Sequence, residues 1–165
     1  MTTPVTPPVT HWPILETRVL TWDDEPACAA FAAGLAAQPG ITAAFITLHG
    51  PLGAGKTTFV RHLLRALGVQ GRIKSPTFAV VETYELPGLA ISHFDFYRFS
   101  DPREWEDAGF RDLYAAPGLK LAEWPEKAAP MLPLADLRLH IDVLDDDRRL
   151  VRAEACTPRG VQLLP

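Results

Sequence analysis

Residues 50–58 have the side-chain types and the spacing that most directly indicate chemistry. Their sequence, GPLGAGKTT, fits the pattern G-x-x-x-x-G-K-[ST], in which glycines let backbone N–H groups close around phosphate oxygens. Lys56 can reach the β- and γ-phosphates of a nucleotide, and the hydroxyl of Thr57 is suited to bind Mg²⁺. Pro51 has no N–H, so the neighbouring amides must donate instead. The residues expected to hold the phosphates are Gly53, Ala54, Gly55, Lys56, Thr57 and Thr58.

The sequence on either side of this loop predicts the strand and the helix that the motif requires. Residues 43–48 are apolar and short enough for a buried strand. After the loop, apolar residues recur at helical spacing from Phe59 to Leu67, and Gly68 stands where a helix takes a left-handed cap. The helix N-terminus would then face the phosphates with its positive end.

Two further predicted strands end on acidic residues. Residues 78–85 and 89–95 are rich in β-branched and aromatic side chains and flank a Leu-Pro-Gly turn, so they predict a hairpin that ends at Asp95. Residues 118–124 predict another strand, which carries Glu123 near its end and stops at Pro125.

The rest of the chain predicts elements that surround this unit. A helix with Thr21, Asp23 or Asp24 as its N-terminal cap carries Pro26 in its first turn and stops at Pro39 and Gly40. Residues 145–147, all aspartate, are more typical of a solvated turn than of a metal site. The remaining predicted segments are a strand at 18–20, a helix at 101–108, and paired strands at 137–143 and 150–155.

Length and composition predict a single domain. The chain has 165 residues, of which 47% are hydrophobic and 22% are charged, as is usual for a soluble globular protein. Residues 1–13, rich in proline and threonine, predict a disordered or extended tail. We therefore expect one domain over residues 14–157, followed by a C-terminal tail at 158–165.

Charge and cysteine usage restrict the partners and the compartment. The net charge of −4 argues against a broad nucleic-acid surface, so another subunit would have to hold any RNA. Cys28 and Cys156 are far apart in sequence, which indicates neither a metal site nor a disulfide framework. With no apolar run of about 20 residues and no signal-peptide pattern, we expect a cytoplasmic protein without membrane attachment.

The order of these elements predicts an α/β fold. Its central sheet would be mixed, parallel around the phosphate loop and antiparallel in the hairpins, with helices packed on it in a three-layer arrangement typical of P-loop NTPases.

Five motifs, taken in their order along the chain, resemble the TsaE family, also called YjeE. Their residues are 50–58, 74–78, 93–98, 101–104 and 123–125. The resemblance extends from about Leu20 to Arg152, and Pro51 departs from it because many members have aspartate there. It implies an ATPase that requires Mg²⁺ and takes part in threonylcarbamoyl modification of adenosine 37 in tRNAs reading ANN codons. It also implies regulation of a TsaD–TsaB complex by the nucleotide state, tRNA contact only through that complex, and weak ATP hydrolysis by the chain alone.

The resemblance also implies roles for individual residues. Asp95 resembles the family's Walker-B-type aspartate, which holds Mg²⁺ directly or through water, and Glu123 resembles an acid that coordinates the metal or positions water. An acid beside Thr57 suits Mg²⁺, which uses only one or two carboxylates. The alternatives are a capping or ion-paired Asp95 and a buried, paired Glu123, and direct general-base action by Glu123 stays open.

Four further residues are expected to contact the nucleotide. Ser75 and Thr77 resemble a switch-like loop, in which a hydroxyl would meet the γ-phosphate or Mg²⁺ only when ATP is bound. Thr77 is our first candidate for that contact, and we count it with Lys56 and the two acids as catalytic. Glu25 and Arg149 match positions on the family's base and ribose side.

Two residues near the acids allow more than one interpretation. Trp124 is either a core or pocket-wall residue or an exposed anchor for a partner. His93 lies on the same face of its predicted strand as Asp95, where we favour a structural hydrogen bond over a role as ligand or base.

Two other classes of function fit the phosphate loop. A small-molecule kinase needs a lid with arginines over the phosphates, and residues 99–135 are too short and proline-rich for one. A GTPase needs a guanine-reading Asn-Lys-x-Asp segment, which the chain lacks. The kinase is the stronger alternative.

Overall fold

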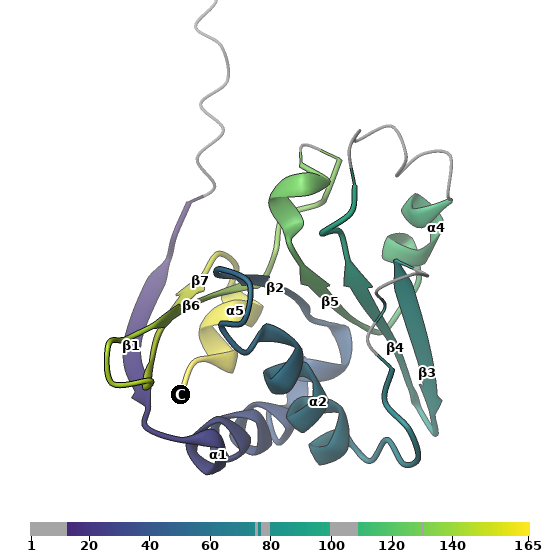
Figure 1. Cartoon of the computed structure of the whole chain (residues 1–165). Helices are drawn as coiled ribbons and strands as arrows, with labels where there is room; N and C mark the ends of the chain where they lie inside the picture. The colour runs from purple at the N-terminus through teal and green to yellow at the C-terminus, as the bar shows by residue number, and fades with distance from the viewer. Residues whose placement is uncertain (1–12, 75, 77–79, 100–108, 130) are drawn as a thin grey trace, which may run out of the picture.

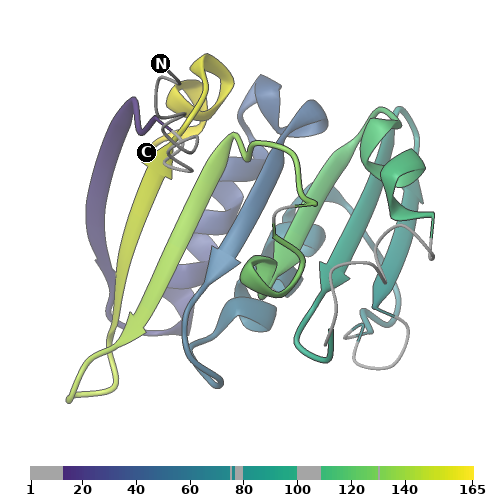
Figure 2. The same ribbon diagram turned by 90° about the horizontal axis from the view of Figure 1, so that it is seen from above.

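The computed structural model describes residues 13–74, 76, 80–99, 109–129 and 131–165. Within them, seven strands form one sheet in the order β1-β7-β6-β2-β5-β4-β3, with helices on both faces (Figures 1 and 2). The strands are β1 (Glu16–Trp22), β2 (Phe45–His49), β3 (Val81–Leu86), β4 (Leu89–Asp95), β5 (Leu119–Glu123), β6 (Leu137–Val143) and β7 (Arg149–Ala155).

The sheet is parallel at its centre and antiparallel at both sides. β2 pairs in parallel with β5 and β6, and β5 pairs in parallel with β4. The β3–β4 and β6–β7 hairpins and the β1–β7 pair are antiparallel. This arrangement confirms the predicted mixed sheet, and it brings the carboxyl ends of β2, β4 and β5 to one edge.

Helices α1 (Glu25–Ala36) and α2 (Lys56–Leu67) lie side by side against one face of the sheet (Figure 1). Of the three cap candidates, Asp24 precedes α1, and its side chain accepts a hydrogen bond from the amide of Ala27 at 2.9 Å. Gly68 ends α2 in the left-handed conformation, with φ 109°. The shorter elements are α4 (Phe110–Ala115), α5 (Pro158–Leu163) and the 3₁₀ helices η1 (Pro39–Ala43) and η2 (Pro125–Lys127).

Two hydrophobic clusters fill the faces of the sheet. The larger one lies under α1 and α2, where the ring of Phe59 stacks on that of Trp22 with centroids 5.7 Å apart. The smaller one lies on the opposite face, where Phe94 of β4 packs edge-on against Phe110 of α4. Because both faces are covered there, every residue of β5 is buried.

The C-terminal segment contains a helix. Residues 158–165, which we expected to form a tail, include α5, and its Leu163 is buried in the larger cluster. A Cβ on Gly160 would come within 1.9 Å of the Asp136 carbonyl oxygen, so only glycine permits this close approach of α5 to the sheet.

Three predictions concern residues outside the described part of the chain: the N-terminal tail up to residue 12, the helix at 101–108, and the loop with Ser75 and Thr77. Among the residues that are described, each helix is too short or too polar to cross a lipid bilayer.

Candidate functional site

The loop that is predicted to bind phosphate, residues 50–55, connects the end of β2 to the first turn of α2. Gly50 (φ 148°), Gly53 (φ 80°) and Gly55 (φ 105°) all have positive φ values, which glycine adopts without strain. At Gly50 a Cβ would also lie 2.3 Å from the carbonyl oxygen of Ile141, so no other residue fits there. The loop ends at the N-terminus of a 12-residue helix. The partial positive charge at that N-terminus favours anions.

Lys56 lies inside the loop that precedes it. Its ammonium group donates hydrogen bonds to the carbonyl oxygens of Gly50 and Pro51, the second at 3.1 Å, and its side chain is almost fully buried. Burial lowers the pKa of Lys56, and the negative charges of Glu123, Glu126 and Asp95 oppose that shift. The ammonium also lies 4.1 Å from the centroid of the Trp124 ring.

Thr57 and Glu123 meet at the carboxyl edge of the sheet. The hydroxyl of Thr57, in the first turn of α2, donates to Oε1 of Glu123 at 2.8 Å. Glu123 ends β5, the strand next to β2, so the parallel pairing of these strands brings it to the loop. The carboxylate is only 2% exposed, and a buried carboxylate needs such partners.

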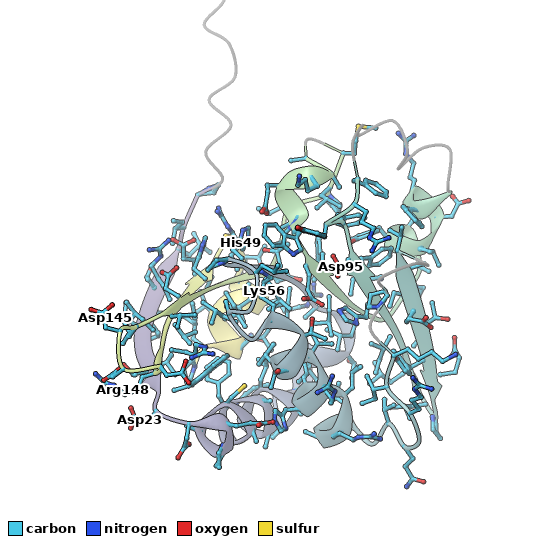
Figure 3. The ribbon with its side chains drawn as sticks, in the orientation of Figure 1. Asp23, His49, Lys56, Asp95, Asp145 and Arg148 are labelled. Atoms are coloured by element: carbon cyan, nitrogen blue, oxygen red, sulfur yellow. The ribbon has the colours of Figure 1, made fainter. Side chains whose placement is uncertain are left out.

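Asp95 ends the next strand, β4, and stands opposite Glu123 in the β4–β5 register. Its Oδ1 accepts a hydrogen bond from the amide of Tyr97 at 3.0 Å. Burial raises the pKa of the Asp95 carboxyl, the Tyr97 hydrogen bond opposes this, and the nearby charge of Glu123 adds to it. In Figure 3, Lys56 and His49 lie near the end of β2, and Asp95 lies beyond them at the end of β4.

These oxygen donors suit a hard divalent cation. The described residues include no cluster of three or more His, Cys, Asp or Glu side chains that could hold a metal ion. Mg²⁺ does not need such a cluster, because it keeps several waters and takes one or two carboxylates together with phosphate oxygens. A hydroxyl bonded to one carboxylate, with a second carboxylate on the adjacent strand, fits that requirement.

His93 lies on β4, next to Glu123 of β5, and is 1% exposed. Its Nε2 is 2.6 Å from Oε2 of Glu123. The structural hydrogen bond that we favoured from the sequence is therefore present. The sequence did not indicate that its partner is Glu123, one of the two acids of the site.

A cavity of about 460 Å³ opens on the other side of the loop and brings together Glu25 and Arg149, which are distant in sequence. Glu25 pairs with His62 at 2.9 Å, and Nε of Arg149 donates to the carbonyl oxygen of Ala54 at 2.9 Å. Asp23, Asp145 and Arg148 lie on this side of the molecule in Figure 3. The walls come from the end of β1, the start of α1, the loop with the first turn of α2, and the β6–β7 turn. They include Trp22, Asp24, Cys28, Gly55, Thr58, Asp146 and Asp147.

The sequence indicated neither the backbone conformation and contacts of Trp124 nor the position of Trp22. Trp124 has a left-handed backbone (φ 55°), and its half-buried ring contacts both Lys56 and Tyr97, which supports the pocket-wall interpretation. Trp22 lines the cavity that contains Glu25 and Arg149, and the only signal for this in the sequence is an aromatic residue just after a predicted strand. Ser75 and Thr77 lie outside the described residues, so their expected contacts stay predictions.

Comparison with known proteins gives consistent matches. A family model described as threonylcarbamoyl adenosine biosynthesis protein TsaE matches residues 22–151. The tRNA threonylcarbamoyladenosine biosynthesis protein TsaE of Haemophilus influenzae is 46% identical over 108 residues, which is 66% of this chain and 68% of the relative. The protein of the same name from Bacillus subtilis is 37% identical over 115 residues, 66% of this chain and 72% of the relative. The crystal structure of YdiB from Bacillus subtilis superposes with a TM-score of 0.74 at 27% identity, over 90% of this chain and 91% of the other.

Proposed function

Because this chain belongs to the TsaE family, whose role is tRNA threonylcarbamoyladenosine biosynthesis, we propose that it acts there as a Mg²⁺-dependent ATPase. In this proposal ATP binding and hydrolysis regulate a TsaD–TsaB complex that modifies adenosine 37 of tRNAs reading ANN codons. The observation that carries the ATPase proposal is the hydrogen bond of 2.8 Å between the Thr57 hydroxyl and Glu123. This bond joins Thr57, whose hydroxyl would bind the metal ion, to Glu123. Both groups would then lie near the γ-phosphate of a bound nucleotide.

The chain's own groups account for phosphate binding. Backbone amides of residues 53–58 and the N-terminus of α2 supply hydrogen bonds and positive potential to the β-phosphate. The ammonium of Lys56 donates to loop carbonyls in the structure. With a nucleotide bound, the same N–H groups would donate to phosphate oxygens instead. Its buried position strengthens that charge interaction, because the local dielectric constant is lower than in water.

The acids supply the negative side of the site. Thr57, Asp95 and Glu123 would hold Mg²⁺, which neutralises charge on the β- and γ-phosphates when it is bound. Glu123 is also placed to orient a water, since its carboxylate lies next to the first turn of α2. The cavity with Glu25 and Arg149 lies on the side of the loop away from Asp95 and Glu123, which supports it as the place for the base and ribose.

The expected partners are TsaD and TsaB. The net charge of −4 supports an indirect relation to tRNA, because a direct one would require clustered positive charge. Tyr97 is 46% exposed, and its ring packs at a tilt against that of Trp124, so one wall of the site is open to a partner protein. Such a partner could alter hydrolysis by contacting this wall, in line with weak activity of the chain alone.

Nucleotide binding and turnover measurements test the proposal. ATP and GTP affinities are measured by calorimetry with Mg²⁺ and with EDTA, and phosphate release is measured with and without the TsaD–TsaB pair. We expect a preference for ATP, Mg²⁺ dependence, and stimulation by the pair. Transfer of phosphate to a metabolite would favour the small-molecule kinase instead, and an unstimulated or absent hydrolysis would contradict the regulatory role.

A further inference from the structure

We propose that His93 is a positioning residue that holds Glu123 in the orientation required for the metal site. This inference rests on the proposed Mg²⁺-nucleotide function and adds a residue to it. His93 is only 1% exposed and lies behind Glu123, so its ring has no route to a nucleotide. Any effect on the site must therefore pass through the carboxylate.

Three side chains form a continuous hydrogen-bonded chain across three elements. Thr57 of α2 donates to Oε1 of Glu123 at 2.8 Å, and His93 of β4 lies 2.6 Å from Oε2 of the same carboxylate. Each oxygen of the Glu123 carboxylate therefore has its own partner: Thr57 next to the loop and His93 in the interior. A carboxylate with both oxygens bonded has one orientation, whereas a carboxylate bonded once can rotate about its side chain.

The surroundings of the imidazole define which nitrogen carries its proton. An ionised carboxylate only accepts hydrogen bonds, so Nε2 of His93 must donate to Glu123. The other nitrogen, Nδ1, is buried and has no hydrogen-bond partner among the described residues. A proton there would be a buried donor without an acceptor, which is unfavourable. The ring is therefore the Nε2–H tautomer, with its donor directed at Oε2.

This arrangement divides the two oxygens of Glu123 between two tasks. Oε2 is occupied by His93 and cannot turn toward a cation, so Oε1 alone faces Thr57 and the loop. Mg²⁺ accepts few protein ligands and requires near-ideal geometry, so a single preset oxygen suits it better than a mobile carboxylate. Without His93, Oε2 would be buried and unpaired, and the carboxylate would turn toward another donor such as Lys56.

The test compares two substitutions that differ in one donor. His93→Phe keeps a planar ring of similar size but has no N–H, while His93→Gln has an amide that can donate near the position of Nε2. Mn²⁺ binding to the ADP complex is titrated by electron paramagnetic resonance, and ADP binding without metal is measured in EDTA. We expect His93→Phe to weaken Mn²⁺ binding by about 10- to 100-fold while metal-free ADP affinity changes less than about twofold. His93→Gln should recover most of the Mn²⁺ affinity.

A matched control removes the same kind of bond elsewhere. His140 lies 2.6 Å from Glu154 on the β6–β7 hairpin, and neither residue contacts Thr57 or Glu123. His140→Phe should leave Mn²⁺ affinity unchanged. If the unmodified protein bound ADP but no Mn²⁺ with it, the proposed metal-dependent function would be wrong. If the unmodified protein bound Mn²⁺–ADP and His93→Phe bound it equally well, only the role of His93 would be wrong.

Two further results would also contradict the inference. Equal losses in both His93 variants, extending to metal-free ADP, would indicate a packing role. If neither variant folds, the nitrogen-15 spectrum of the unmodified protein decides the question, because it reports which imidazole nitrogen is protonated. We expect a proton on Nε2 of His93 that exchanges slowly with water, and a proton found on Nδ1 alone would exclude the bond to Glu123.

Discussion

The aromatic ring of Trp124 packs against the ammonium of Lys56, with Nζ 4.1 Å from the ring centroid. Trp124 adopts φ 55°, a left-handed conformation that costs a non-glycine residue of order 1–3 kcal/mol. The surrounding structure thus maintains a strained backbone that places an aromatic ring beside the ammonium of Lys56.

Removing this ring should weaken nucleotide binding moderately. A cation–π contact whose aromatic ring is only half-buried contributes about 0.5–1 kcal/mol, which corresponds to a loss of roughly two- to fivefold in ATP affinity. We expect Trp124→Leu to show this loss in calorimetry and Trp124→Phe to keep most of the affinity. Equal ATP affinities for Trp124→Leu and the unmodified protein would show that the ring does not hold the Lys56 ammonium in position for binding.

Asp95→Asn should separate nucleotide binding from metal binding. The substitution keeps the side-chain oxygen that accepts the Tyr97 amide but removes the charge beside Glu123. We expect Mg²⁺ affinity of the nucleotide complex to fall by about tenfold or more, with metal-free ADP affinity little changed. Stimulated ATP hydrolysis should fall with it, and an unaltered Mg²⁺ titration would assign Asp95 a purely structural role.

Gly50→Ala should destabilise the fold, because both the positive φ and the contact with Ile141 exclude a Cβ. We expect the free energy of unfolding to decrease by at least about 2 kcal/mol, measured by urea denaturation. Gly34→Ala is the matched control: this exposed helical glycine has nothing within 4 Å of its Cβ position. It should gain about 0.5–1 kcal/mol, and similar losses in both variants would contradict our account.

His49 should make stability depend on pH. Burial lowers the pKa of His49 to about 3, and its neighbours are Thr47, the stacked ring of His140, and Glu126 at 4.0 Å. Glu126 is more than half exposed, so its charge is screened and burial dominates. Below the unfolded pKa of about 6.5 only the unfolded chain takes up this proton, so stability is lost as pH falls from 6.5 toward 3.

The expected loss from His49 is about 2 kcal/mol at pH 5. Urea denaturation between pH 7 and pH 4 measures it, and His49→Gln should give a flatter pH dependence because its side chain does not titrate. Parallel curves for the two proteins would mean that His49 is protonated in the folded state as readily as in the unfolded state.

Thr77→Ala tests the switch-like loop predicted from the sequence. The substitution should leave ADP affinity intact while impairing activation of the TsaD–TsaB partners by ATP, because the hydroxyl is expected to contact only the γ-phosphate or Mg²⁺. Ser75→Ala serves as the comparison and should have a smaller effect. A loss of ADP and ATP affinity to the same extent would count against a switch at this position.

The sequence by itself determined the elements whose signals are local. The glycines, Lys56 and Thr57 define the phosphate loop at fixed spacing, Gly68 ends α2 in the left-handed conformation, and alternating side chains define β6. Asp95 and Glu123 were identified as strand-end acids for the same reason. Backbone conformation and periodicity depend on neighbouring residues, so these features can be recognised without knowing the fold.

Only the tertiary structure decided which distant groups meet. Parallel pairing of β2, β5 and β4 brings Thr57 to Glu123 and sets Asp95 opposite Glu123. The packing of β4 between β5 and β3 buries His93 beside the Glu123 carboxylate. The contact of Lys56 with Trp124 depends on a left-handed residue that no propensity indicates. Strand order and burial arise from packing of the whole chain, and they establish the partners of each charged group and therefore the chemistry of the site.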